Sequence, residues 1–357
     1  MISLKQMDDH EESPIEIDGS FGEGGGQILR TALAFSTIFK RSLTVHHIRA
    51  KRAKPGLGHQ HLMALKALAQ ISGAEVEGGA IGSERLTFIP KAICPGDYKF
   101  TIGTAGSVTL LLQALLPPLS ISLKDSRLTL AGGTHVPWSP PFHFLSEILF
   151  PILSLMGISV EARIEQWGWY PKGGGILQVE IKSISHLKPI SLLERGLLKK
   201  IRGISATSHL PKHVGERQRD EALRRIEKEM KVNAEISVLH DVSANGPGSF
   251  LFLVAESEKA IAGFSSLGKR GKPAEEVAKE AVESLKDYVE SDGCIDPHLA
   301  DQLIPFLVLA KGHSSFSTMR ITEHLLTNLW VVQHFSDVKI VQRGEKGEQG
   351  RVDFFNE

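Results

Sequence analysis

The chain has 357 residues, and 41% of them are hydrophobic, so its length is that of two or three domains of roughly 150 residues each. Lys and Arg together number 41 and Asp and Glu also number 41, which excludes a protein that coats nucleic acid through a large positive net charge. Any polyanionic partner must therefore be bound by a local cluster of cations. The 34 glycines and 17 prolines are too few for a collagen-like or wholly disordered chain.

Cysteine usage and the N-terminal sequence indicate a cytoplasmic protein. Cys94 and Cys294 lie far apart, without the spacing of a disulfide framework or of a structural zinc site. The first residues are acidic and polar where a signal peptide is basic and then apolar, so we expect a flexible arm over residues 1–14. The most apolar stretches, 110–119 and 144–156, are shorter than the roughly 20 residues of a membrane span. No membrane partner is expected.

Hydrophobic periodicity predicts the same β-α-β-α-β-β unit three times, with a period of about eighty residues. The first unit has strands at 15–17, 43–48, 74–77 and 86–89 and helices at 27–39 and 59–72. The second has strands at 98–102, 127–131, 159–165 and 175–181 and helices at 108–116 and 142–156. The third has helices at 297–311 and 323–334 and a hairpin at 338–342 and 351–355, whereas its first strand is unclear.

Residues 194–292 interrupt this pattern before the third unit. They predict strands at 203–207, 234–240 and 249–254 and helices at 214–230 and 273–288. The expected fold class is therefore α/β (α+β), with three repeated units around a common axis. Residues 15–193 and 293–357 form the body, and residues 194–292 form a smaller inserted α/β domain.

A glycine-rich loop follows the first strand and opens the first helix. Residues 22–30 read Gly-Glu-Gly-Gly-Gly-Gln-Ile-Leu-Arg. Glycines let the backbone approach a phosphate closely, and a helix N-terminus presents free N–H groups to it. The spacing is neither the dinucleotide fingerprint nor a Walker A loop. We interpret the loop as a phosphate or nucleotide site, with a tight strand-to-helix turn as the alternative, and Glu23 as a carboxylate for a divalent cation.

The densest cationic cluster of the chain lies at the end of the next predicted strand. Four of the six residues 49–54 are Arg or Lys, and Pro55 and Gly56 then force a turn, so that the charges fan out at a rim. Arginine forks and lysine charges suit phosphodiester contacts. The alternative is a solvated rim without a ligand.

Two helix starts in the third unit carry further candidates. Asp296 is the expected N-cap of one helix, and Pro305 bends that helix beside Asp301. His324 lies in the first turn of the other helix, with Thr322 as N-cap. A helix N-terminus disfavours imidazolium, so His324 would be neutral and nucleophilic. Because the chain contains 15 histidines, a purely structural His324 is the alternative.

Taken together, these residues closely resemble the RNA 3′-terminal phosphate cyclases over nearly the whole chain, from 15 to 355. Six motifs occur in family order: the loop at 22–30, the run at 48–56, Gly-Gly-Thr at 132–134, Tyr-Pro-Lys-Gly-Gly-Gly at 170–175, Leu-Ala-Asp-Gln at 299–302 and His-Leu-Leu-Thr-Asn at 324–328. The resemblance also implies three repeats of the kind seen in enolpyruvyl transferases, and a homodimer.

The resemblance implies an ATP-dependent ligase reaction. An RNA 3′-phosphate end would be converted to a 2′,3′-cyclic phosphate, with release of AMP and diphosphate. His324 would attack the α-phosphate of ATP to form a histidinyl-AMP, and AMP would then pass to the RNA end as an anhydride. The implied partners are ATP and RNA with a 3′-phosphate, and the implied cofactor is Mg²⁺ or Mn²⁺.

The resemblance also carries over roles for individual residues. Glu23 matches the metal-site carboxylate, and Asp301 would orient or polarise the ring of His324. The matching nucleotide-binding positions are Gln113, His298, Leu299, Ala300, Asp301 and Gln302. The positions that match phosphate or RNA contacts are Arg30, Arg49, Arg52, Gln60 and His61.

Two departures from the family pattern predict altered nucleotide or RNA affinity. His298 stands where bacterial relatives often have Tyr, and Trp167 occupies a usually basic position. Phe264 of the insert is a candidate lid over the adenine.

One alternative function is that of the cyclase-like branch, a non-catalytic RNA-binding factor in ribosome assembly that lacks the nucleophilic histidine. The presence of His324 argues against it. Another is a small-molecule transferase without covalent AMP.

Overall fold

The computed structural model describes residues 13–357. Of the expected N-terminal arm, residues 1–12 lie outside the described residues. Within residues 13–357 no helix has the length and apolar character needed to cross a membrane.

The body contains three four-stranded sheets with one shared strand order, in which two parallel strands are followed by an antiparallel hairpin. The first sheet has the order β1-β2-β4-β3, with β1 (Ile15–Asp18), β2 (Leu43–His46), β3 (Glu75–Glu77) and β4 (Leu86–Ile89). The second has the order β5-β6-β8-β7, with β5 (Asp97–Thr101), β6 (Ser126–Gly132), β7 (Val160–Gln166) and β8 (Gly175–Ile181). The repeat that hydrophobic periodicity predicts is thus confirmed.

The third sheet follows the same order as β9-β14-β16-β15, with β9 (Ser191–Leu192), β14 (Gly312–Thr318), β15 (Lys339–Arg343) and β16 (Gly350–Asn356). Strand β9 pairs in parallel with β14 through Ser191 and Leu192, so it is the first strand that the sequence left unidentified. It precedes the insert. The insert therefore begins after the first strand of the third unit and ends before that unit's first helix.

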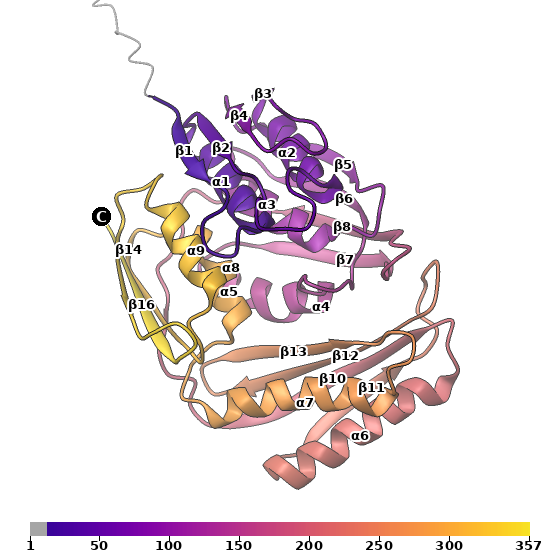
Figure 1. The fold of residues 1–357 in the computed structure, drawn as a ribbon. Coiled ribbons are helices and arrows are strands. Elements are labelled where there is room, and N and C mark those ends of the chain that lie inside the picture. Colours follow the sequence, from indigo (N-terminus) through magenta and orange to yellow (C-terminus); the bar gives the residue numbers. More distant parts are fainter. Residues whose placement is uncertain (1–12) are drawn as a thin grey trace, which may run out of the picture.

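The helices of the three units pack against one another, as Figure 1 shows. They are α1 (Gly26–Phe39), α2 (His59–Ser72), α3 (Val108–Ser120), α8 (Pro297–Leu307) and α9 (Glu323–Val332). Helix α1 contacts α2, α3 and α9, and α8 contacts both α3 and α9. The apolar stripes of these amphipathic helices thus form one core, and the N-termini of α1 and α9 belong to neighbouring helices.

The predicted helix at 142–156 is divided into α4 (Phe142–Phe144), the π-helix η1 (Leu145–Leu149) and α5 (Phe150–Leu155). Pro151 has no N–H with which to continue an α-helical ladder. The N–H of the preceding residue, Phe150, bonds to the carbonyl of Leu145, five residues back, which is the hydrogen-bond pattern of a π-helix. Helix α3 continues to Ser120 through Pro117 and Pro118, beyond the predicted end at 116.

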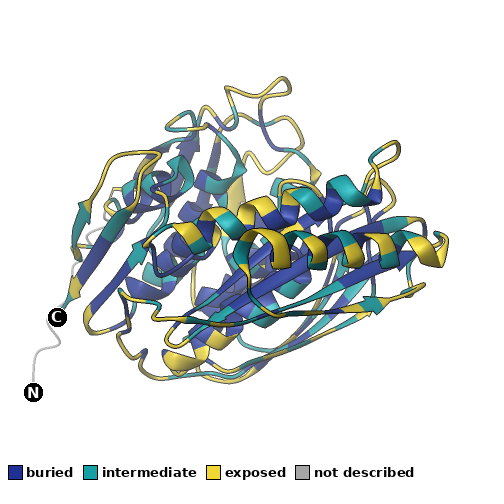
Figure 2. Cartoon of the chain, turned by 90° about the horizontal axis from the view of Figure 1, so that it is seen from below, coloured by how far each residue is buried: buried dark blue, intermediate teal, exposed yellow. Residues whose placement is uncertain are grey.

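The insert is a sheet of order β11-β10-β12-β13 with two helices on one face. Its elements are β10 (Leu198–Ser208), α6 (Lys212–Met230), β11 (Ala234–Leu239), β12 (Gly248–Ser257), β13 (Ile261–Leu267) and α7 (Ala274–Glu290). Strand β13 is absent from the sequence-based prediction. The two helices cover the face that points away from the body, and their outer residues are exposed (Figures 1 and 2).

Strand β12 is buried on both faces and joins the insert to the body. Leu251 and Leu253 belong to the core under α6 and α7, whereas Phe250, Phe252 and Val254 belong to the core of the body. Successive side chains of a strand point to opposite faces, so this alternation places the insert sheet between its own helices and the body. The position of the insert is therefore fixed by apolar packing.

Truncation of Phe252, which is 2% exposed, tests this packing. The substitution Phe252→Ala should lower the free energy of unfolding by about 3–5 kcal/mol, because it leaves a cavity between insert and body. Chemical denaturation followed by tryptophan fluorescence measures the loss. Leu123→Ala is the control, since Leu123 is 90% exposed, and it should change the free energy by no more than about 0.5 kcal/mol. Equal effects of the two substitutions would contradict the packing of β12 between the insert and the body.

Candidate active site

His324 lies in the first turn of α9, where it meets the glycine-rich loop. The side chain of Thr322 caps the helix by accepting a hydrogen bond from the N–H of Leu325, at 3.0 Å. The ring of Phe21 stacks on Trp330 of the same helix, with 4.0 Å between ring centroids. These contacts hold the loop at residues 22–26 beside the N-terminus of α9.

Gln27 makes a reciprocal pair of hydrogen bonds with His324. Its side-chain nitrogen Nε2 donates to the carbonyl oxygen of His324 at 3.1 Å, so its Oε1 faces Nδ1 of the imidazole and bonds to it. A carbonyl oxygen only accepts, so Nδ1 carries the ring proton. The lone pair is then on Nε2, which lies 3.5 Å from Oε2 of Glu23. The resulting tautomer presents Nε2 as the nucleophilic atom.

The surroundings of His324 favour its neutral form. Burial is the largest effect and lowers the pKa of the imidazole below its ordinary value of 6.5. The negative charge of Glu23 acts in the opposite direction, and the positive charges of Arg30 and Arg52 lower the pKa further. The neutral ring, with its one proton on Nδ1, is therefore favoured over imidazolium at neutral pH.

Asp301 lines the same cavity as His324 but is held in another way. Among residues 13–357, no hydrogen bond joins its carboxyl group to the ring. Its backbone carbonyl accepts a hydrogen bond from Nδ2 of Asn328 at 2.9 Å, and Oδ1 of Asn328 accepts one from Thr31 at 2.8 Å. Burial raises the pKa of Asp301 well above its usual range, while Arg30 opposes this shift. In this structure Gln27, not Asp301, orients the imidazole.

A cavity of about 430 Å³ extends from His324 between the body and the insert. Gln113 and Gln302 both line it, and each has one buried polar atom without a hydrogen-bond partner: Nε2 of Gln113 and Oε1 of Gln302. Both atoms are themselves buried, so the two amides would have to rotate to present them to a ligand in the cavity. His298 lines the cavity from α8, and Phe264 lines it from strand β13 of the insert, so the insert supplies part of its wall.

Two candidate nucleotide-binding residues do not reach this cavity. The side chains of Leu299 and Ala300 are 0% exposed and belong to the hydrophobic core, on the other side of α8. Trp167 is also buried, and its ring stacks on His135 with 4.2 Å between centroids, in an aromatic cluster that includes Phe250 of the insert. Its departure from the family pattern therefore affects packing between body and insert.

Three of the expected phosphate-binding side chains surround the glycine-rich loop. Nη2 of Arg52 lies 3.6 Å from Oε2 of Glu23. A Cβ atom built on Gly26 would lie 2.1 Å from Nε2 of His61 and 3.1 Å from Nη1 of Arg30. Only glycine therefore allows these groups to approach the start of α1. Together they place two positive charges and one imidazole at a helix N-terminus.

Burial governs the protonation of these groups. It lowers the pKa of Arg30 to about 10, against the attraction of Asp301, so Arg30 stays charged at neutral pH. It lowers the pKa of His61 to about 3, with Arg30 and Arg49 adding to the shift, so His61 is neutral. Nδ1 of His61 accepts a hydrogen bond from the N–H of Gly58 at 3.2 Å, which leaves Nε2–H as a donor toward the loop.

Two other candidates are engaged with backbone groups. Nη1 of Arg49 donates to the carbonyl of Gly56 at 2.8 Å, and burial together with Arg52 lowers the pKa of this guanidinium. Oε1 of Gln60 accepts a hydrogen bond from the N–H of Ser107, the N-cap of α3, at 3.0 Å. Both side chains thus shape the loops around the site.

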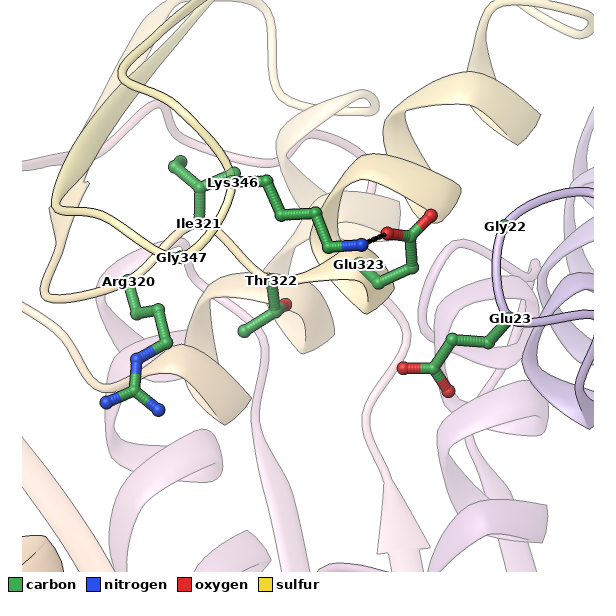
Figure 3. A pocket seen from close by; sticks show the side chains of 8 residues that line it. All are labelled: Gly22, Glu23, Arg320, Ile321, Thr322, Glu323, Lys346 and Gly347. Atoms are coloured by element: carbon green, nitrogen blue, oxygen red, sulfur yellow. Dashed lines mark ion pairs between the residues drawn. The ribbon is translucent and has the colours of Figure 1, made fainter.

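A second hollow of about 460 Å³ is bordered by Glu23 (Figure 3). Arg320, Thr322 and Glu323 line it from the segment that precedes His324, and Lys346 lines it from the loop between β15 and β16. Lys346 forms an ion pair with Glu323, as the dashed line in Figure 3 shows. Arg320 is exposed and has no ion pair within residues 13–357. Glu23 borders this hollow and also contacts His324, which lines the cavity.

Comparison with known proteins identifies the family. The model of the family described as RNA 3′-terminal phosphate cyclase matches residues 21–341. The chain belongs to the RNA 3′-terminal phosphate cyclase family. A cyclase from Gloeothece citriformis is 41% identical over 335 residues, which cover 91% of this chain and 95% of that protein. A cyclase from Methanopyrus kandleri is 42% identical over 346 residues, which cover 96% of this chain and 98% of that protein.

A solved structure of an enolpyruvyl transferase from Streptomyces tendae also matches, at 9% identity and a TM-score of 0.36, over 96% of this chain and 48% of that chain. The three-unit fold of this member of the cyclase family is established by its own strand pairings.

The tautomer and pKa of His324 can be measured directly by ¹⁵N NMR of the imidazole. We expect the Nδ1–H tautomer and a pKa below 6.5, because burial disfavours the charged ring. Glu23→Gln should lower this pKa further, because it removes the negative charge that stabilises imidazolium. The exposed His186 is the control, and its imidazole signals should be identical in the two proteins. An Nε2–H tautomer would contradict the role of Gln27.

Proposed function

We propose that the chain converts RNA 3′-phosphate ends to 2′,3′-cyclic phosphates with consumption of ATP and release of AMP and diphosphate. The observation that carries this proposal is the neutral His324, whose free Nε2 faces a carboxylate at the edge of a nucleotide-sized cavity. Membership of the cyclase family supports the same reaction.

The cavity suits the adenosine part of ATP. After rotation of their amides, the side chains of Gln113 and Gln302 would be complementary to the edge of adenine, which offers ring nitrogens as acceptors and an amino group as donor. His298 lines the same space and offers a flat ring for stacking. A polar atom buried without a partner is unfavourable, so nucleotide binding would satisfy two such atoms at once.

The triphosphate would lie along the glycine-rich loop toward the N-terminus of α1. Arg30 and Arg52 would neutralise its charge, and the neutral His61 would donate a hydrogen bond through Nε2–H. Glu23 fits one ligand of Mg²⁺ or Mn²⁺, since such ions take one or two carboxylates together with phosphate oxygens. A bound ion would offset the negative charge on the phosphates.

The proposed reaction has three transfers. Nε2 of His324 attacks the α-phosphorus of ATP, so that a P–N bond forms and the P–O bond to diphosphate breaks, while Nδ1–H remains bonded to Gln27. An oxygen of the RNA 3′-phosphate then attacks the same phosphorus and releases His324. The adjacent 2′-hydroxyl finally attacks the 3′-phosphorus, loses its proton and displaces AMP. The last step is intramolecular and benefits from proximity.

The two hollows suggest how one nucleophile serves two substrates. The cavity beside His324 would hold the nucleotide, and the hollow lined by Arg320 and Lys346 would receive the RNA end. Glu23 borders the hollow and contacts His324, so a phosphate bound there would lie close to the adenylylated ring.

Covalent labelling tests the nucleophile. Incubation with α-³²P-ATP and Mg²⁺ or Mn²⁺, followed by denaturing electrophoresis, should give an acid-labile label on the chain, because a phosphoramidate forms at His324. His324→Ala should abolish the label, and the matched control His186→Ala should retain it. No label on the unaltered chain would favour a non-catalytic RNA-binding factor or a transferase without covalent AMP.

The route of the RNA end is tested through Arg320. Arg320→Ala should raise KM for a 3′-phosphorylated oligonucleotide about fivefold, the effect of losing one exposed phosphate contact worth about 1 kcal/mol. Self-adenylylation should be unchanged, because the residue does not line the nucleotide cavity. Lys311→Ala, which removes another exposed positive charge, is the control. An equal loss of self-adenylylation in Arg320→Ala would contradict the separate RNA path.

A further inference from the structure

The side chains of Asp18, His46 and His47 meet at the end of the first sheet. Each is of a type that can bind a metal ion, and the proposed reaction uses none of them. Asp18 ends β1, and its parallel partner in the register is His46, which ends β2. His47 follows directly, and its Nδ1 lies 3.2 Å from Oδ1 of Asp18. One oxygen of Asp18 and one ring nitrogen of each histidine all lie within 4.8 Å of one another.

The backbone at His47 is unusual and brings the two imidazoles together. Successive side chains along a strand point to opposite faces, so neighbouring histidines would ordinarily diverge. His47 instead has a φ of +53°, in the left-handed region that residues other than glycine seldom adopt. The centroids of the two rings are 4.8 Å apart, with the rings in a T-shaped arrangement. Residues in such conformations are concentrated at functional sites.

The surrounding backbone holds this geometry in place. The N–H of Gly19 donates to the carbonyl of His46 at 2.8 Å, and the N–H of Ala50 donates to the carbonyl of His47 at 3.1 Å. The N–H of Ser20 donates to Oδ1 of Asp18 at 2.9 Å and so fixes the carboxylate. The side chains of Asp18 and His47 are 44% and 61% exposed, which leaves room for water as further ligands.

We propose that Asp18, His46 and His47 form a binding site for a divalent transition-metal ion of the zinc class. Two imidazoles and one carboxylate are ligands that favour Zn²⁺, Co²⁺ or Ni²⁺ over Mg²⁺. In a tetrahedral site with bonds of 2.0–2.1 Å, neighbouring ligand atoms are about 3.4 Å apart, so Asp18 and His47 already have the required separation. Rotation of the partly exposed His46 would complete the set.

The site lies at the start of both loops that form the candidate active site. Asp18 precedes the glycine-rich loop, and His47 precedes the cationic run that begins at Arg49. An ion bound by Asp18, His46 and His47 would link the ends of β1 and β2 and thereby restrain both loops. It is distinct from the Mg²⁺ or Mn²⁺ assigned to Glu23, whose carboxylate contacts Arg52 and His324 instead.

Metal binding by the full chain tests the proposal. The protein is treated with EDTA, dialysed and titrated with ZnCl₂ by calorimetry, in a background that carries Cys94→Ser and His324→Ala so that the exposed thiol and the active-site imidazole do not contribute. We expect one ion per chain, unaffected by millimolar Mg²⁺. His46→Ala and His47→Ala should each weaken binding at least tenfold, because loss of even an outer-shell partner of a metal ligand usually costs tenfold or more.

Spectroscopy and a matched control complete the design. Co²⁺ in place of Zn²⁺ should give visible absorption bands that are lost in Asp18→Asn, while His186→Ala, at an exposed histidine elsewhere, should leave affinity and bands unchanged. Unchanged thermal unfolding of the metal-free variants shows that each still folds. Saturable binding that survives all three ligand substitutions, or no binding to the background protein, would overturn the proposal. Because the readout is metal binding, its failure is independent of the cyclase reaction.

Discussion

The reciprocal pair of hydrogen bonds between Gln27 and His324 is the contact on which the candidate active site depends. These residues are 297 positions apart in the sequence, one at the start of α1 and the other at the start of α9. The bond from the glutamine side chain to the backbone of His324 fixes the orientation of the amide, and the amide in turn fixes the tautomer of the imidazole. The position and the tautomer of the His324 imidazole are thus set by a single side chain from another unit.

That contact is possible because the three units pack their helices into one core. Helix α1 contacts helices of its own unit and of both others, and the bonds from Thr31 to Asn328 and from Asn328 to Asp301 join α1, α9 and α8. The insert adds the outer wall of the cavity through strand β13, and β12 holds that wall against the body. Each unit alone would therefore leave this candidate site incomplete.

Sequence patterns were informative where one local constraint decides the structure. Alternating and helical periodicities located every strand of the first and second units. The glycine-rich loop and the Thr322 cap located the two segments that meet at His324. Strand β9 has only two residues, and β14 buries Ser314 and Ser315, so neither has the apolar alternation by which strands are found. The role of Gln27 depends on a contact across the fold and has no local signal. Leu299 and Ala300 share a motif with Asp301, yet helical geometry turns them into the core.

The zero net charge of the chain is reflected at this site, where cations lie close to carboxylates and carbonyl groups. Arg52 is near Glu23, Lys346 is paired with Glu323, and Lys51 donates to the carbonyl of Gly22 at 3.0 Å. Arg52 and Lys346 are therefore compensated by carboxylates when no substrate is bound, which limits non-specific attraction of polyanions. A phosphate that enters must compete with these partners, and Glu23 is the carboxylate that a divalent ion would draw away from Arg52. Cation binding at Glu23 would thereby free Arg52 for the triphosphate, so metal and nucleotide should bind cooperatively.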